Sequence, residues 1–318
     1  MLRSLIKFRM NIVKSIEEIT EPFTKGVITI GNFDGVHLGH QSLLHIVVEK
    51  AHNIGGTALA MTFDPHPIRV LKPNHHPPLI TLMEQKIELI SKTGIDFLIC
   101  VPFDKQFADI TADQFIRDLL IKRIGMESII VGHDYTFGKN REGNLGLLEK
   151  YAGLLGFEIV VADWIKAIQN GNTRISSTVI RELVIAGKVE QAQKILGRNY
   201  QIRGVVTSGR KRGGRLLGFP TANINLVDEL CPKSGVYAVL VEHNKKTYQG
   251  VANIGYSPTF DDNIFTVEVH ILDFDQNIYD EQIKVDFVHH LRSEIKFSNI
   301  DELAAQIKKD IIKARSVL

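Results

Sequence analysis

Two histidines at a tight turn make the first candidate site. The segment GNFDGVHLGH follows an apolar run, and a turn through Asp34 and Gly35 leads to His37 and His40 at the expected start of a helix. A helix start presents unpaired backbone N–H groups and partial positive charge, which favour a phosphate. If the turn between them is helical, histidines three residues apart share one face and can contact the same phosphate, and Gly39 between them lets a ligand approach the backbone. The alternative is that both histidines are turn and cap residues.

Transfer of an AMP group from ATP suits such a site. A phosphate monoester is largely dianionic near neutral pH, because its second pKa is about 6, so it can attack the α-phosphate of ATP without a strong base. The reaction needs charge stabilisation instead. Imidazole donors, backbone N–H groups and Mg²⁺ can supply that stabilisation, with pyrophosphate as the leaving group.

A glycine- and arginine-rich segment precedes the second candidate site. Residues 207–224, TSGRKRGGRLLGFPTANI, can wrap a polyphosphate through backbone N–H groups and local positive charge, although they are not a Walker A motif. Thr221 and Asn223 alternate along an extended stretch, so both can offer neutral oxygens to one Mg²⁺. A plain loop-to-strand transition is the alternative. The loop residues expected to contact ATP are Gly209, Lys211, Gly214 and Gly218.

One carboxylate completes the second site. Alternation in TVEVH places Glu268 on the same strand face as Thr266 and His270, opposite Val267 and Val269. An alcohol is a poor nucleophile while protonated, so its phosphorylation requires a positioned base. Glu268 is the candidate for that base, and a surface glutamate on a strand is the alternative.

The composition narrows the class of protein. Among 318 residues, 38 Lys and Arg nearly balance 36 Asp and Glu, so no basic field indicates nucleic acid as a partner. Cys100 and Cys231 fit neither a disulfide framework nor a zinc site, and we expect a reducing cytoplasmic location. No apolar run approaches the ~20 residues that span a bilayer, so no membrane partner is expected. Residues 1–9 are too short for a signal peptide, and the first domain is taken from Met10.

The amino-terminal half must hold the first site on an α/β sheet. Between about 26 and 155, short β-branched runs alternate with helical patterns, which predicts crossover connections and parallel strands. The predicted strands cover 27–31, 57–63, 97–101, 129–132 and 157–162, with a helix over 40–52. Two helices over 176–186 and 189–196, ended by glycines, then connect to the next domain.

The carboxy-terminal half must hold the second site on a small barrel. Several short alternating runs with turns between them predict antiparallel strands. They cover 201–207, 236–242, 247–254, 265–272 and 283–288. An amphipathic helix over 300–315 then closes the domain.

Several segments in order resemble one known family. GNFDGVHLGH resembles the signature of the nucleotidyltransferase superfamily, and MTFDPHP, GHDYTFGKNREGN and ISSTVIR narrow the resemblance to bacterial bifunctional riboflavin kinase/FMN adenylyltransferases. LGFPTAN, GVANIGYSPTF, EVHILDF and LRSEIKF resemble the riboflavin kinase domain of that family. The resemblance spans about 26–312. It implies a Rossmann-like adenylyltransferase domain over 10–186 and a β-barrel riboflavin kinase domain with a C-terminal helix over 187–318.

The resemblance also implies substrates and roles for individual residues. The substrates would be riboflavin, FMN and ATP, with Mg²⁺. The catalytic residues would be His37, His40 and Glu268, and Mg²⁺ would be bound by Thr221 and Asn223. Further ATP contacts would come from Gly31, Phe33, Asp34, Gly39, Ser177, Thr178 and Arg181. Flavin contacts would come from Asp64, His66, Asp134, Phe137 and Arg292.

Two other functions stay open on the sequence. The chain could be a non-catalytic flavin- or nucleotide-binding regulator, or an enzyme in which only the kinase works. Asp261 and Asp280 stand where relatives usually have glycine, and we expect them to alter loop shape or affinity rather than the chemistry. The sequence indicates no oligomeric state.

Overall fold

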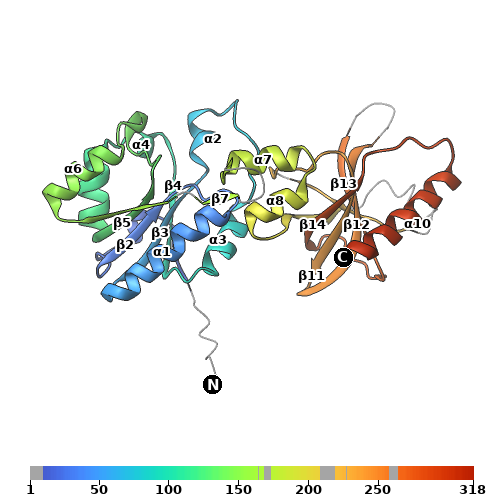
Figure 1. Ribbon diagram of the computed structural model, residues 1–318, viewed down its shortest axis with the longest axis horizontal. Coiled ribbons are helices and arrows are strands. Elements are labelled where there is room, and N and C mark those ends of the chain that lie inside the picture. The colour runs from blue at the N-terminus through green and yellow to red at the C-terminus, as the bar shows by residue number, and fades with distance from the viewer. Residues whose placement is uncertain (1–9, 164, 168–172, 208–218, 227, 258–263) are drawn as a thin grey trace, which may run out of the picture. The chain divides into compact units, whose positions relative to one another are not determined.

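The computed structural model describes residues 10–163, 165–167, 173–207, 219–226, 228–257 and 264–318. The chain forms two compact units. The first holds the residues up to Pro77 together with Thr81–Ile175, and the second holds Pro78–Ile80 and Ser176–Leu318. Figure 1 shows the elements of both units. Each unit is described by itself below.

The first unit is built on a parallel sheet, as predicted, and it has six strands rather than the five predicted. Its strand order is β1-β4-β3-β2-β5-β6, and every neighbouring pair is parallel. The strands are β1 Asn11–Val13, β2 Gly26–Ile30, β3 Thr57–Asp64, β4 Phe97–Pro102, β5 Met126–Gly132 and β6 Glu158–Ala162. All five residues of β2 are buried, which explains its unbroken apolar run. Two short strands, β7 Lys166–Ala167 and β8 Thr173–Arg174, form a separate pair.

Helices cover both faces of this sheet. One core contains α1 and α3 residues such as Leu44, Val47 and Ile90, and the other contains Phe115 and Leu148 from η2 and α6. The helices are α1 Leu38–Ile54, α2 Pro67–Leu71, α3 Met83–Ser91, α4 Lys105–Ala108, α5 Ala112–Gln114 and α6 Leu145–Leu155, with the 3₁₀ turns η1 Ile16–Glu18 and η3 Lys139–Arg141 and the π-helix η2 Phe115–Arg123. The unit is therefore a three-layer α/β fold.

The strand order places the first candidate site at the point where the sheet reverses direction. From β2 the chain continues to β3 and β4 on one side, and then returns to β5 and β6 on the other side of β2. Ligands of open α/β sheets bind at the carboxyl ends of the strands next to such a point. Helix α1 begins directly after β2, so its first residues lie there.

The second unit contains a closed antiparallel barrel with the strand order β10-β13-β12-β11-β14-β9. The strands are β9 Tyr200–Thr207, β10 Ala222–Ile224, β11 Gly235–His243, β12 Lys246–Ser257, β13 Ile264–Ile271 and β14 Gln282–Arg292. Helices α7 Ser177–Ile185 and α8 Val189–Leu196 precede the barrel, and α10 Ile300–Val317 follows it. The predicted fold class is confirmed for both units.

The barrel interior is filled by large side chains. Tyr200, Tyr237 and Phe287 are among the largest fully buried residues of the chain. Residues of the opposite strand face, such as Val236 and Ala238, pack with Ala314 of α10 outside the barrel. Since side chains alternate along each strand, polar residues between the buried ones must face outward.

Candidate active sites

The turn after β2 is held rigidly by a residue far away in the sequence. The carboxylate of Asp34, 2% exposed, accepts hydrogen bonds from the backbone N–H of Thr81 at 3.1 Å and from its hydroxyl at 3.3 Å. The hydroxyl oxygen of Thr81 also accepts from the backbone N–H of Gly35 at 3.0 Å. Phe33 is buried beneath the turn with a positive φ of 46°, and its ring lies against Gly31. The turn is thereby fixed before any ligand binds.

The two signature histidines lie against one another at the start of α1. His37 is the N-cap, and its Nδ1 accepts a hydrogen bond from the backbone N–H of His40 at 3.2 Å. The two rings stack with centroids 3.6 Å apart, and the ring of Phe33 meets that of His40 edge-on at 5.3 Å. A Cβ on Gly39 would lie 3.1 Å from the His37 ring, so glycine leaves room for it. His37 can therefore cap α1 and still form one site together with His40.

A buried lysine lies beside this pair, and the sequence reading missed it. Lys86 on α3 is 5% exposed, and its Nζ lies 3.4 Å from the hydroxyl of Thr62. Burial lowers the pKa of Lys86, while the charges of Asp34 and Asp64 oppose that effect. Burial also holds the pKa of His40 well below its ordinary value, with smaller contributions from His37 and Lys86. A lysine within the apolar pattern MEQKIELIS was the only sequence signal for this residue.

The predicted flavin contacts fall into two groups. Asp64 is exposed at the end of β3, and the neighbouring His66 caps α2 by accepting from the backbone N–H of Ile68 at 3.2 Å. Asp134 forms an exposed ion pair with Arg174 at 2.7 Å. Phe137, in contrast, is 7% exposed and belongs to a hydrophobic core. The structure thus gives Phe137 a packing role.

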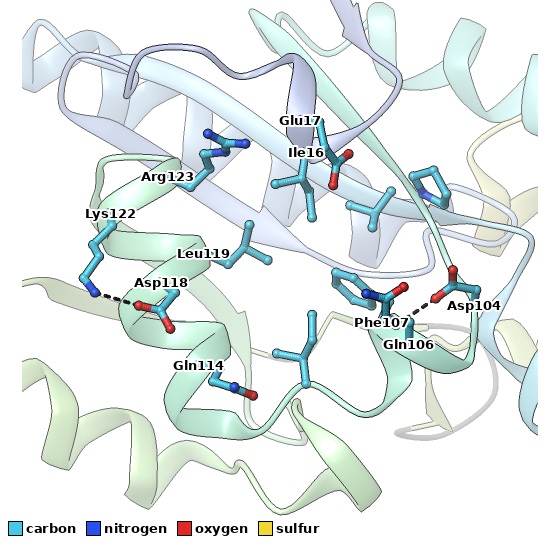
Figure 2. Close-up of a pocket in the computed structure, with 13 residues that line it drawn as sticks. Ile16, Glu17, Asp104, Gln106, Phe107, Gln114, Asp118, Leu119, Lys122 and Arg123 are labelled. Carbon is cyan, nitrogen blue, oxygen red and sulfur yellow. Dashed lines mark hydrogen bonds and ion pairs between the residues drawn. The ribbon is translucent and has the colours of Figure 1, made fainter.

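A groove of about 830 Å³ lies at the carboxyl end of β4. Figure 2 shows Ile16, Phe107 and Leu119 around its apolar centre, with the ion pair between Asp118 and Lys122 at its rim. The ring of Phe107 also contacts that of Phe63, with centroids 5.8 Å apart. Phe107 thus lines the groove and also contacts Phe63 near the end of β3.

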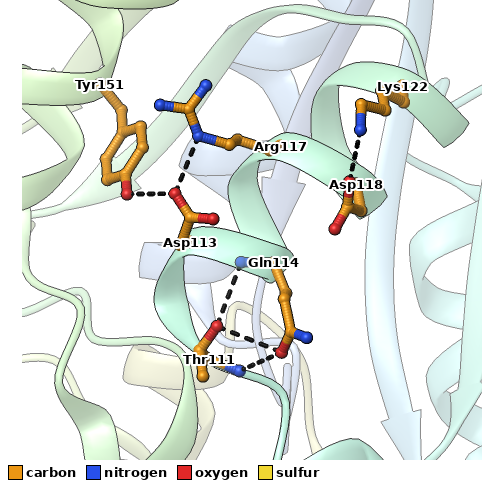
Figure 3. A network of polar contacts seen from close by, with 7 residues as sticks. All are labelled: Thr111, Asp113, Gln114, Arg117, Asp118, Lys122 and Tyr151. Atoms are coloured by element: carbon orange, nitrogen blue, oxygen red, sulfur yellow. Dashed lines mark hydrogen bonds and ion pairs between the residues drawn. The ribbon is translucent and has the colours of Figure 1, made fainter.

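The loop that carries Phe137 is fastened at several points. Lys139 donates its backbone N–H to the carbonyl of Ile110 at 2.8 Å, and the Glu142 carboxylate accepts from the backbone N–H of Ala112 at 2.7 Å. The segment around Ile110 and Ala112, to which the loop is bonded, has further polar contacts of its own. Figure 3 shows a capping box between Thr111 and Gln114, and Asp113 between Tyr151 and Arg117.

Replacement of Gly143 by alanine should disturb this loop. Phe137 and Gly143 exchange two backbone hydrogen bonds, of 3.1 and 2.9 Å, and a Cβ at Gly143 would lie 2.6 Å from the Phe137 ring. Because the ring is buried, we expect Gly143→Ala to cost about 1–3 kcal/mol of stability, as measured by calorimetry. Gly153→Ala is the matched control, because no atom lies within 4 Å of its added Cβ inside α6. Equal melting temperatures for the two variants would contradict this account.

On the barrel, three polar residues form a row across adjacent strands. Glu268 on β13 is paired with Asn223 on β10 and with Asn253 on β12, so their side chains lie on the same outer face. Cβ atoms of such directly opposed pairs are about 4.5–5.5 Å apart. The structure therefore brings Glu268 and Asn223 together, as the sequence reading required. Asn253 was missed, although its position between the buried Ala252 and Ile254 is visible in GVANIG.

The chemistry of Glu268 suits a base. Burial raises the pKa of its carboxyl group. Within the described part of the chain, its carboxylate makes no hydrogen bond or ion pair. Next to it, His270 bonds through Nδ1 to the carbonyl of Pro220 at 2.8 Å, and its ring meets that of Phe219. This bond ties the segment that carries Thr221 to β13.

The remaining predicted residues have other surroundings. The guanidinium of Arg292 binds the buried carboxylate of Asp310 on α10, with its closest contact at 2.7 Å. Ser177, Thr178 and Arg181 belong to α7 in the second unit, where Arg181 donates to the carbonyl of Pro78 at 3.1 Å. Gly209, Lys211, Gly214, Gly218 and Asp261 lie outside the described residues.

Asp280, which stands where relatives usually have glycine, adopts a backbone conformation typical of glycine. Asp280 has a φ of 63°, in the left-handed region that favours glycine. Its backbone N–H donates to the carbonyl of Val206 at 2.8 Å. An aspartate tolerates this conformation better than most residues.

Comparison with known proteins covers both units. The FAD synthetase family model matches residues 20–179, and the riboflavin kinase family model matches residues 196–318. The bifunctional riboflavin kinase/FMN adenylyltransferase of Escherichia coli K12 is 37% identical over 308 residues, which cover 96% of this chain and 97% of the relative. The protein of the same name from Bacillus subtilis 168 is 40% identical over 298 residues, which cover 92% of each chain.

A crystal structure is also similar. It is of a Streptococcus pneumoniae protein described as a macrolide-efflux protein, with a TM-score of 0.85 and 32% identity, and the match covers 96% of this chain and 98% of that one. None of the helices in the described ranges of the present chain combines the length and apolar character that a bilayer crossing requires.

Proposed function

The chain belongs to the bifunctional riboflavin kinase/FMN adenylyltransferase family, and we propose that each of its two candidate sites carries one of the two reactions. The protein phosphorylates riboflavin to FMN and then transfers an adenylyl group to FMN, which gives FAD. The proposed kinase site is the outer face of the barrel around Glu268. The proposed adenylyltransferase site is the start of α1. The predicted boundary at 186/187 lies between the two family matches, which supports it, whereas the compact units of the structure divide between Ile175 and Ser176.

The observation that carries the kinase assignment is the setting of Glu268. Its half-buried carboxylate lies beside Asn223 and has a raised pKa, so it can take a proton from the 5′-hydroxyl of riboflavin. The hydroxyl oxygen then forms a bond to the γ-phosphorus of ATP while the bond to the bridging oxygen breaks. ADP leaves, and the proton stays on Glu268. Gly209, Lys211, Gly214 and Gly218 are proposed to hold the ATP phosphates.

Mg²⁺ fits this site by its donor chemistry. Thr221 and Asn223 would hold it with neutral oxygens, and the described residues contain no cluster of three or more His, Cys, Asp or Glu side chains that would favour another metal. When bound, Mg²⁺ neutralises charge on the transferring phosphates. A divalent ion held by few protein groups and by substrate phosphates is the usual arrangement for Mg²⁺.

The stacked histidines support the adenylyltransferase assignment. The Nδ1 atom of His37 accepts a hydrogen bond, so its uncharged ring carries the proton on Nε2, where it can donate to a phosphate. An FMN phosphate oxygen forms a bond to the α-phosphorus of ATP, and pyrophosphate leaves. We propose that the backbone at Gly31, Phe33, Asp34 and Gly39 lines the nucleotide site. The ATP contacts expected of Ser177, Thr178 and Arg181 stay a prediction.

The flavin is proposed to bind at the carboxyl ends of β3 and β5, near Asp64, His66 and Asp134. The contact between the rings of Phe63 and Phe107 near the end of β3 supports this place, because a flavin ring needs an apolar surface. Phe137 would contribute from beneath, as a packed support. On the barrel, Arg292 would contribute to the riboflavin side of the kinase site while it is held by Asp310.

We propose that the enzyme works in the cytoplasm, where ATP is available and cysteines stay reduced. Both cysteines are free, which supports a reducing compartment. Nothing in the composition favours nucleic acid or membrane as a partner.

A product time course tests the proposed function. Purified protein supplied with riboflavin, ATP and Mg²⁺ should form FMN first and FAD later, as followed by chromatography, and removal of the metal with a chelator should stop phosphorylation. An endpoint at FMN would show that only the kinase works. Binding of FMN in a calorimeter without any product would instead favour a non-catalytic regulator.

A further inference from the structure

We propose that Thr81 is a positioning residue for adenylyl transfer, and that the pairing of Leu79 with residues 228–230 of the second unit holds Thr81 in place. The inference deepens the proposed function and rests on the role given there to the turn after β2. Thr81 acts on the two histidines of that turn through its hydrogen bonds to Asp34 and Gly35.

The turn after β2 has a backbone that needs support from its surroundings. Phe33 and Val36 have positive φ values of 46° and 37°. For a β-branched or bulky residue such a value is an outlier, and it persists only where neighbouring contacts hold the backbone. Val36 directly precedes His37, the N-cap of α1. The place of the first histidine therefore depends on the contacts that keep this turn in shape.

Thr81 supplies three of these contacts from the protein interior. Its backbone N–H and its hydroxyl donate to one carboxylate oxygen of Asp34 at 3.1 and 3.3 Å. Its hydroxyl oxygen accepts from the backbone N–H of Gly35 at 3.0 Å. Thr81 is 1% exposed and Asp34 is 2% exposed, so water does not readily replace a bond that is lost here. The hydroxyl takes part in two of the three bonds and is the group to remove in a test.

The residues directly before Thr81 are bonded within the second unit, to which Pro78–Ile80 belong. Leu79 forms a parallel bridge with Glu229. The backbone N–H of Leu79 donates to the carbonyl of Asp228 at 3.2 Å, and its carbonyl accepts from the backbone N–H of Leu230 at 2.8 Å. The chain therefore leaves a paired segment of the second unit and reaches Thr81 two residues later.

This paired segment is itself attached to the rest of the second unit. The carbonyl of Leu230 accepts a hydrogen bond from the hydroxyl of Tyr200, which is buried inside the barrel. The carbonyl of Pro78 accepts from the guanidinium of Arg181 on α7 at 3.1 Å. Two residues of backbone span at most ~7 Å, so little slack separates the pairing at 79 from the bonds at 81.

The pairing at Leu79 thus contributes to the geometry of the adenylyltransferase turn. Without it, or without the Thr81 hydroxyl, the turn can relax from its strained conformation and carry the histidine donors away from the phosphates. A misplacement of about 1 Å can lower a rate by roughly 10²-fold. Riboflavin phosphorylation does not use this turn and should not depend on the Thr81 hydroxyl.

Substitutions that remove one hydroxyl test the role of Thr81. Thr81→Val keeps the shape of the side chain and should lower FMN adenylylation by about 10- to 100-fold, whereas Thr81→Ser keeps the hydroxyl and should retain most of the rate. Thr93→Val is the matched control, because the Thr93 hydroxyl donates to the carbonyl of Ile90 at 2.7 Å, at the end of α3. Riboflavin phosphorylation should be unchanged in all three. A folded Thr81→Val chain with the full adenylylation rate would overturn the inference.

Hydrogen exchange followed by mass spectrometry gives a readout that does not rely on activity. Peptides that contain 33–37 should exchange faster in Thr81→Val than in the wild type, while peptides from β5 should not change. Leu79→Pro removes the N–H that is bonded to Asp228, although residue 79 lies outside the turn. This variant should also speed exchange at 33–37 and lower FMN adenylylation. If Leu79→Pro leaves both unchanged, the second unit has no part in holding Thr81.

The proposed function and this inference fail in different ways. If the wild type forms FMN and never FAD, the adenylyltransferase assignment fails, and exchange at 33–37 still decides whether Thr81 holds the turn. If the wild type forms FAD and Thr81→Val keeps both its rate and its exchange pattern, only the inference fails. Should Thr81→Val not fold, as judged by exchange in β5, Thr81→Ala takes its place in the comparison with Thr81→Ser. Equal adenylylation by those two variants would then refute the role of the hydroxyl.

Discussion

Glu268→Gln should lower riboflavin phosphorylation by about 10²- to 10⁴-fold and leave the conversion of supplied FMN to FAD unchanged. Glutamine keeps the size and one oxygen of the side chain but cannot take the proton of the hydroxyl. Adenylyl transfer starts from a phosphate that is already ionised, so it needs no such base. Both activities are measured by chromatography on one preparation, which makes each the control for the other.

The pH dependence of riboflavin phosphorylation is a second test of Glu268 as the base. Burial raises the pKa of Glu268, so the wild-type rate should fall with acid at a pH above the ordinary range of a glutamate. Folding favours the protonated carboxyl, and the stability that this contributes is lost as the pH rises through the raised pKa. Glutamine stays uncharged. The variant should therefore melt no lower than the wild type at neutral pH.

Glu242→Gln is the matched control for this substitution. Glu242 lies on β11 of the same barrel and forms a partly exposed ion pair with Lys284 at 2.9 Å. Its replacement should leave both activities intact. If both glutamine variants lose phosphorylation equally, or if Glu268→Gln also loses adenylyl transfer while folded, the assignment of Glu268 as the base of the kinase is wrong.

Removal of the His37 ring should have the second large effect, on adenylyl transfer. His37 has two roles, as the N-cap of α1 and as one of the stacked donors. Asparagine is a good N-cap, so His37→Asn keeps the cap and loses the ring, whereas His37→Ala loses both. Each variant should lower FMN adenylylation by about 10²- to 10³-fold, the usual cost of one donor to a developing charge.

Stability separates the two roles of His37. His37→Ala should also lose about 1 kcal/mol of stability, measured by calorimetry, and His37→Asn should lose much less. Riboflavin phosphorylation should persist in both. A His37→Asn chain with the full rate of FAD formation would show that the cap, and not the ring, is what adenylyl transfer requires.

The longer elements could be predicted because local sequence determines them. The strands β2 to β6 are apolar or β-branched runs that alternate with helical patterns, and this alternation predicted that they are parallel. The three-residue strand β1 was missed, and β10 was expected only as an extended stretch around Thr221 and Asn223, because such short runs carry no periodicity of their own. Their pairing with β4 and β13 depends on the assembled sheets. Tertiary context, not propensity, makes them strands.

The same distinction applies to the sites. His37 and His40 are three residues apart, at the N-cap and in the first turn of α1, so their contact is determined by local sequence. Thr81 bonds to Asp34 from 47 residues away, and only the folded chain places it there. The sequence reading also did not foresee that Arg292 has a buried partner in Asp310, because that ion pair joins β14 to α10. A single sequence does not show which residues, far apart along the chain, will contact each other in the folded protein.

Burial of the two cysteines has a practical outcome for labelling. Burial raises the pKa of Cys100 to about 11 and that of Cys231 to about 12. Thiol reagents attack the deprotonated sulfur, which is scarce at neutral pH for both residues. A cysteine introduced at an exposed position would therefore react with a maleimide dye far ahead of the native pair. Fluorophores could then be attached to each unit in turn without first removing either native cysteine.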